Sequence, residues 1–70
     1  MILRETTPPA VGTKLLLDWN PGEEAPQEVT VVSTGSPFMN AGEFDVSDGE
    51  GAWTVMQMDV DRGVTWTVVS

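Results

Sequence analysis

The sequence contains no cysteine, no histidine and no tyrosine, and only three basic residues among 70. Without cysteine the chain can form no disulfide and offers no thiolate to a metal or a substrate. Without histidine as well, Ser-His and Cys-His nucleophile pairs are impossible, and Lys14 is the one lysine left to activate a hydroxyl. We therefore expect a protein that is not an enzyme and that carries no cofactor.

Basic residues are scarce, but acidic residues are abundant. Eleven acidic residues outweigh the three basic ones, so the net charge is -8 at neutral pH. The electrostatic field of this charge repels nucleic acid and anionic membranes and attracts cationic surfaces. We therefore expect no direct binding to nucleic acid or to membranes. The acidic segments near residues 18–24, 45–50 and 59–61 lack the ligand spacing of a calcium loop. We expect no metal at these segments.

The length of 70 residues and a hydrophobic content of 40% suit one small domain. No stretch approaches the roughly 20 apolar residues of a membrane span, and residues 1–5 lack the features of a signal peptide. We expect a soluble protein in the cytoplasm, either of its own cell or of a host cell.

Residues 1–10 are predicted to form an N-terminal arm, and residues 11–70 to form the folded domain. Pro8 and Pro9 lack backbone donors and favour an extended chain. One interpretation is a frayed end or a first edge strand. The other is an arm that docks on a neighbouring subunit.

Three segments show the pattern of strands. Residues 14–19 alternate in polarity, residues 28–34 are rich in β-branched side chains, and residues 42–47 alternate again. Asn20-Pro21-Gly22 favours a type II turn after the first segment. In the loop before Gly42, the pair Phe38-Met39 is expected to plug the mouth of a barrel.

Two further turns predict hairpins. Asp48-Gly49 is typical of a type I′ turn, which would place Ser47 opposite Glu50 and Phe44 opposite Trp53. Asp61-Arg62-Gly63 favours a three-residue turn after a long strand over residues 52–60. In that strand the inward residues would be odd-numbered up to Val55 and even-numbered from Met56. A bulge near Val55 and Met56 would explain this change, because one extra residue reverses the face to which each side chain points. The second turn predicts the pairs Val60 with Val64, Met58 with Trp66 and Met56 with Val68.

Five strands, turns marked by glycine or proline and no helical period predict an all-β fold, a strongly bent antiparallel barrel. The layout of a long first loop, middle hairpins and a final short strand resembles the SH3-like and Tudor-like barrels, although the chain lacks the ALYDY-type segment of peptide-binding SH3 domains. An OB-like or other open barrel fits this layout almost as well. The predicted core is Leu15, Leu17, Val29, Val31, Phe44, Val46, Trp53, Val55, Met58, Trp66 and Val68.

An aromatic cage for a methylated amine needs several exposed rings. The predicted hairpins assign Trp53 and Trp66 to the core, which leaves Trp19 as the one exposed tryptophan. We therefore expect no cage.

The acidic surface remains as the feature that could carry a function. Alternation predicts Glu43 and Asp45 on the outward face of one strand, and alternate outward residues lie roughly 6.5 to 7 Å apart, close to the phosphate spacing of a DNA strand. The remaining acids of this surface lie in turns and loops. The predicted partner-binding residues are Glu23, Glu24, Glu43, Asp45, Asp48 and Glu50.

These observations favour a binding protein, monomeric or a small homo-oligomer, that occupies the basic, nucleic-acid-binding surface of a protein partner. In size, acidity and lack of catalytic residues it resembles phage-encoded DNA-mimic inhibitors and anti-CRISPR proteins. The alternative is a structural protein of a virion or other assembly whose residues 1–9 contact neighbours. An adaptor domain, or an acidity that serves solubility alone, also fits the composition.

Overall fold

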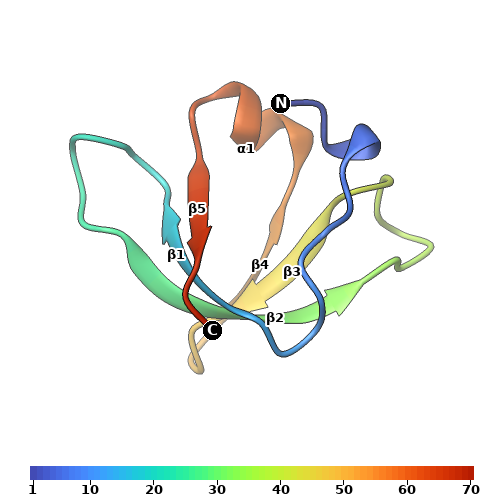
Figure 1. Ribbon diagram of the computed structural model, residues 1–70, viewed down its shortest axis with the longest axis horizontal. Helices are drawn as coiled ribbons and strands as arrows, with labels where there is room; N and C mark the ends of the chain where they lie inside the picture. The colour runs from blue at the N-terminus through green and yellow to red at the C-terminus, as the bar shows by residue number, and fades with distance from the viewer.

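The structure, a computed structural model that describes residues 1–70, contains five short strands, one 3-10 turn and one short helix (Figure 1). The strands form a single antiparallel sheet in the order β4-β3-β2-β1-β5. The predicted all-β class with five antiparallel strands is confirmed. In chain order the elements are η1 (Leu3–Glu5), β1 (Lys14–Asp18), β2 (Gln27–Thr34), β3 (Phe44–Ser47), β4 (Ala52–Val55), α1 (Gln57–Asp61) and β5 (Thr65–Val68).

Alternation sends the apolar side chains of the strands to one face of the sheet. In β1, Leu15 and Leu17 are buried and Leu16 between them is exposed. Successive side chains of a strand point to opposite faces, so the buried residues of β1, β2 and β3 share the inner face. The turn predicted after β1 is also present, since the backbone N–H of Glu23 donates to the Asn20 carbonyl at 2.9 Å and Gly22 has a φ of 85°.

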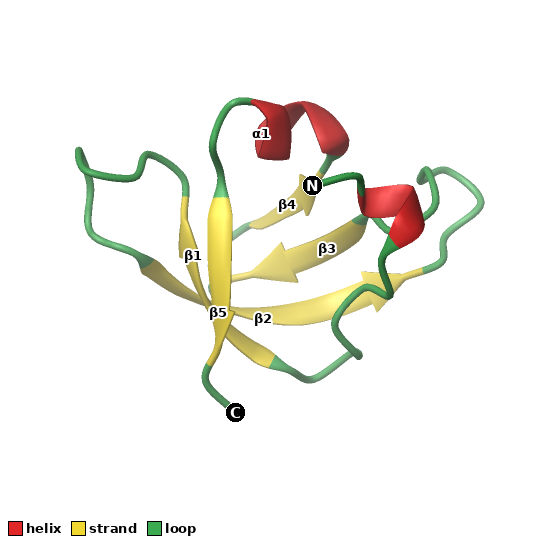
Figure 2. Cartoon of the chain, turned by 45° about the horizontal axis from the view of Figure 1, so that its top comes forward, coloured by secondary structure: helices red, strands yellow, loops and turns green.

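The sheet is strongly bent but open. β2 has 8 residues, and its register with β3 shifts between Val31 and Ser33, an irregularity that bends a strand. β1 pairs with β2 on one side and with β5 on the other, whereas β4 and β5 each have a single neighbour. Figure 2 shows α1 and the N-terminal turn above the same side of the curved sheet. Because β4 and β5 do not pair, closure into a barrel is not confirmed.

The hairpin between β3 and β4 has a longer loop than predicted. Ser47 pairs with Ala52 and Phe44 with Val55, so the register differs by two residues from the predicted one. A type I′ turn needs a positive φ at both central residues, but only glycine residues have one in this structure, so Asp48 does not take the first central position of such a turn. A shift of two residues keeps every side chain on its predicted face.

The prediction of one long strand over residues 52–60 is wrong. β4 ends at Val55, and α1 follows. The backbone N–H of Met56 donates to the Asp59 carboxylate at 2.9 Å, which supplies half of a capping box, and Gly63 ends the segment with a φ of 106°. β5 consequently pairs with β1, not with β4. The predicted bulge at 55–56 and the three predicted pairs across the turn at residues 61–63 are therefore absent. No helix of the structure is long and apolar enough to cross a membrane.

The core is smaller than predicted. Trp53, Met58 and Val68 are 41%, 51% and 59% exposed, and Trp66 is partly buried against the core. Phe38 is 97% exposed and plugs nothing. Two buried apolar residues, Leu3 and Val64, were not predicted. The predicted core residues confirmed as buried are Leu15, Leu17, Val29, Val31, Phe44, Val46 and Val55.

Residues 1–10 form no strand, but they pack against the rest of the chain. Leu3 is 1% exposed. Its backbone N–H donates to Gln57 Oε1 at 2.7 Å, and Gln57 Nε2 donates to the Met1 carbonyl at 2.9 Å. The carbonyl of Leu3 lies so close to Gly42 that a Cβ at that position would stand 1.8 Å from it. The N-terminal segment is thus held by contacts within its own chain.

Candidate protein-binding surface

A chain of side-chain hydrogen bonds links the end of β1 to the loop between β3 and β4. Trp19 Nε1 donates to Gln27 Oε1 at 3.1 Å, and Gln27 Nε2 donates to Asp48 Oδ2 at 2.9 Å. The connection follows from the sheet, because β2 lies between β1 and β3 and begins at Gln27. The indole of Trp19 and the carboxylate of Asp48 are therefore fixed relative to one another.

Asp48 also organises its own loop. Its Oδ1 accepts from the backbone N–H groups of Glu50 at 2.8 Å and Gly51 at 2.9 Å. The N–H groups of Glu50 and Gly51 favour the ionised carboxylate and lower the pKa of Asp48 below its ordinary value. An exposed negative charge is thus held in one place at neutral pH.

Trp53 lies beside Trp19. It pairs with Val46 across β3 and β4, so its side chain starts on the inner face, but β4 is an edge strand and nothing covers the ring fully. The two indoles meet edge to face, with centroids 6.3 Å apart and planes at 68°. The prediction that Trp19 would be the one exposed tryptophan is wrong. We call the group Trp19, Gln27, Asp48 and Trp53 the tryptophan surface.

The six predicted partner-binding residues do not form one row. Glu23 and Glu24 are exposed in the loop between β1 and β2, and Asp48 and Glu50 are exposed in the loop between β3 and β4. The two loops start from the tryptophan surface but extend apart (Figure 1). They place the predicted carboxylates in two separate groups, one in each loop.

Glu43 and Asp45 do not form the predicted outward row. Glu43 is 5% exposed and precedes β3, so strand alternation does not govern its direction. Its carboxylate accepts from the backbone N–H groups of Asn40 at 3.0 Å and Gln57 at 3.2 Å, which ties the loop before β3 to the start of α1. Asp45 is half-buried and accepts from the Thr54 hydroxyl on β4. Glu43 serves the fold, and its predicted exposure is wrong.

The carboxylates that form hydrogen bonds receive them from backbone amides and neutral side chains. The donors to Glu43, Asp45, Asp48 and their acidic neighbours on α1 include no lysine and no arginine. No three carboxylates lie close enough together to hold a metal ion. The negative charge of these groups is therefore not offset by internal hydrogen-bonded cations.

The sequence did not identify Gln27 or Trp53 as parts of this surface. A weak signal for Trp53 exists, because it is the second residue of β4 and lies close to an acidic, glycine-rich turn. Gln27 carries no such signal, since its two contacts join residues 8 and 21 positions away. No protein family, curated protein or solved structure gave a match to this chain.

Proposed function

We propose that this protein is a non-catalytic inhibitor or regulator that binds the basic, nucleic-acid-binding surface of a protein partner. The tryptophan surface is the proposed centre of contact, and Glu23, Glu24 and Glu50 are the neighbouring charges. The observation that carries the proposal is that one carboxylate, Asp48, is fixed by hydrogen bonds beside a partly exposed aromatic pair without any hydrogen-bonded cation of its own. Tryptophan and tyrosine are enriched at interface centres, and charges at the rim steer association.

The proposed architecture is an incompletely closed SH3-like barrel. The meander from β1 to β4, followed by the return of β5 to the free side of β1, supports this layout. The short helix between β4 and β5 and the bend of β2 support it too. The assembly alternative gains no such support, because residues 1–9 contact their own chain through Leu3 and Gln57.

The proposal is tested by two double variants with the same net charge. Glu24→Lys with Glu50→Lys alters the two acidic loops next to the tryptophan surface, and Glu5→Lys with Asp61→Lys alters exposed acids in η1 and α1. A partner identified by affinity capture must be a nucleic-acid-binding protein that releases its nucleic acid when this protein binds. We expect the first variant to weaken that competition by about tenfold or more and the second by less than about threefold, because local complementarity matters more than total charge.

Two outcomes would contradict the proposal. Equal effects of both variants would show that no particular surface is used. Recovery of the protein in large particles that require residues 1–9 would favour the assembly alternative.

A further inference from the structure

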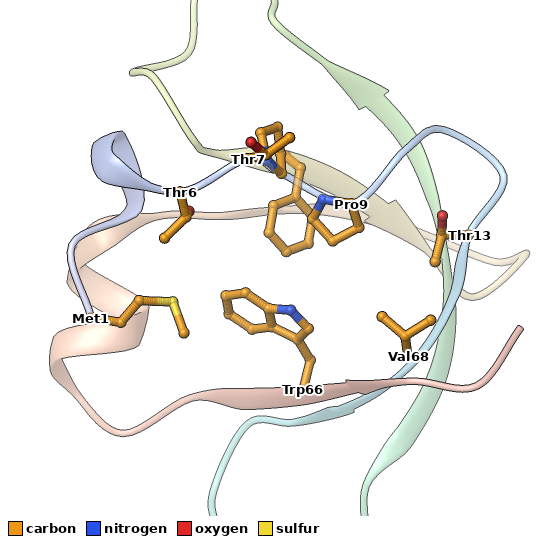
Figure 3. A pocket seen from close by; sticks show the side chains of 9 residues that line it. Met1, Thr6, Thr7, Pro9, Thr13, Trp66 and Val68 are labelled. Carbon is orange, nitrogen blue, oxygen red and sulfur yellow. The ribbon is translucent and has the colours of Figure 1, made fainter.

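A groove lies along the free edge of the sheet. It is lined by β5 on one side and by the N-terminal segment on the other, with a volume of about 420 Å³ (Figure 3). All of its lining side chains are uncharged, although the protein as a whole is strongly acidic. The lining residues are Met1, Thr6, Thr7, Pro8, Pro9, Thr13, Phe44, Trp66 and Val68.

A second hollow extends this groove toward α1. It has a volume of about 380 Å³ and shares Met1 and Trp66 with the first. Its other lining residues are Val60 and the stretch from Gly63 to Thr65. Together the two hollows follow β5 from its start to Val68, an elongated shape that suits an extended chain.

The backbone of β5 is unpaired on the side away from β1. β5 ends the strand order, and Val69 N–H donates to the Lys14 carbonyl at 2.9 Å. Because backbone groups of an antiparallel strand alternate in direction, those of Trp66 and Val68 point away from β1. Val64, two residues earlier, follows the same alternation, since its N–H donates to Asp59 and not to β1. This edge therefore offers hydrogen-bonding groups in the pattern that an added strand requires.

Trp66 supplies both an apolar wall and a polar group. Its ring packs edge to face on Phe44, with centroids 5.1 Å apart and planes at 80°. In Figure 3 the indole lies in the groove, on the side that faces the N-terminal segment. The indole that donates a hydrogen bond within the chain is that of Trp19, so Trp66 Nε1 remains available to an incoming acceptor.

We infer that this groove binds an extended segment of the protein partner by strand addition to β5. The segment's backbone would pair with Trp66 and Val68, and one apolar side chain would lie against Trp66 and Phe44. Its flanking residues would be basic, because no charged side chain lines the groove and the protein as a whole has a net charge of -8. The same field opposes a second copy of this chain as the occupant. The sign of the partner's charge rests on the proposed function, but the backbone pairing does not.

The probe is a capped six-residue peptide with alternating valine and lysine, added to the full chain and followed by NMR. We expect saturable shifts of the Trp66 and Val68 amides and of the Trp66 indole N–H. Two further peptides carry N-methyl groups on one or the other alternate set of backbone amides. One set should weaken binding by on the order of tenfold and the other by less than about twofold, because only one set faces β5.

Two matched variants separate this site from the tryptophan surface. Trp66→Phe keeps a ring but removes the indole donor, and we expect it to weaken the peptide severalfold, whereas Trp19→Phe should leave binding unchanged. The variant with Glu24→Lys and Glu50→Lys should still bind one N-methylated peptide more tightly than the other. This result is expected even if that variant shows that the proposed function is wrong. Equal binding of the two methylated peptides, or shifts confined to Trp19 and Trp53, would overturn strand addition.

Discussion

At the scale of single residues, the positions of Trp53 and Glu43 are set by what surrounds them. Trp53 pairs with Val46 and points to the inner face, yet it stays partly exposed because β4 is an edge strand and has no further neighbour to cover the ring. Glu43 lies one residue before β3 and turns inward to accept backbone hydrogen bonds. The place of a residue in the sheet thus decides how deeply its side chain is buried, whereas alternation decides only which face it points to.

Asp48 gives a prediction about pH at this scale. Its pKa is lowered in the folded state by the N–H groups of Glu50 and Gly51, relative to about 3.9 in an unfolded chain. The resulting stability is fully present above the unfolded pKa and is lost as the pH falls through the folded pKa. We expect Asp48→Asn to lose less stability than the wild type between about pH 4 and about pH 2, measured by denaturant unfolding at each pH.

If Asp48→Asn lost stability in parallel with the wild type over this pH range, the backbone N–H donors of Glu50 and Gly51 would not stabilise the ionised form of Asp48.

At the scale of elements, the sequence predicted the strands that alternate over several residues and missed the short helix. β1, β2 and β3 lie close to their predicted ranges. α1 has 5 residues, too few for a helical period to stand out from alternation. Its local signals were present, since Asp59 follows Met56 by three positions and Gly63 ends the segment. The hairpin predicted at residues 61–63 is wrong because the glycine that ends the helix was assigned to a turn between two strands.

The N-terminal segment gives the prediction at this scale. Gly42 and Gly22 have φ values of 84° and 85°, so alanine meets the same backbone penalty at both. A Cβ at Gly42 would stand 1.8 Å from the Leu3 carbonyl, whereas one at Gly22 would meet nothing within 4 Å. We expect Gly42→Ala to detach residues 1–6 and to cost about 2 kcal/mol more than Gly22→Ala, because Leu3 loses its burial.

Hydrogen exchange of the Leu3 and Thr6 amides measures the detachment, and denaturant unfolding measures the free energy. Equal destabilisation by the two alanines, with both amides still protected in Gly42→Ala, would show that the contact between Gly42 and Leu3 does not hold the segment.

At the scale of the whole molecule, the net charge could be predicted from the sequence, but the extent to which the sheet closes into a barrel could not. The net charge follows from composition, and a radius of gyration of 11.2 Å confines it to a small body. The pairing of β5 with β1 and the docking of Leu3 depend on residues about 50 positions apart, which no local pattern specifies. The groove along β5 arises from such contacts, and the tryptophan surface arises from contacts that join β1, β2, β4 and the loop between β3 and β4. Strand alternation alone does not predict either arrangement.

The last prediction concerns the rate at which the protein meets its partner. The Debye length is about 8 Å at physiological salt, shorter than the molecule, so added salt screens the field before contact but affects close contacts less. Raising the salt from about 50 to about 500 mM should slow association by on the order of tenfold and change dissociation by less than about threefold in stopped-flow measurements. Glu24→Gln with Glu50→Gln should flatten this dependence more than Glu5→Gln with Asp61→Asn, which removes the same charge from η1 and α1. An association rate independent of salt would mean that the acidity keeps the chain soluble and does not guide it to a partner.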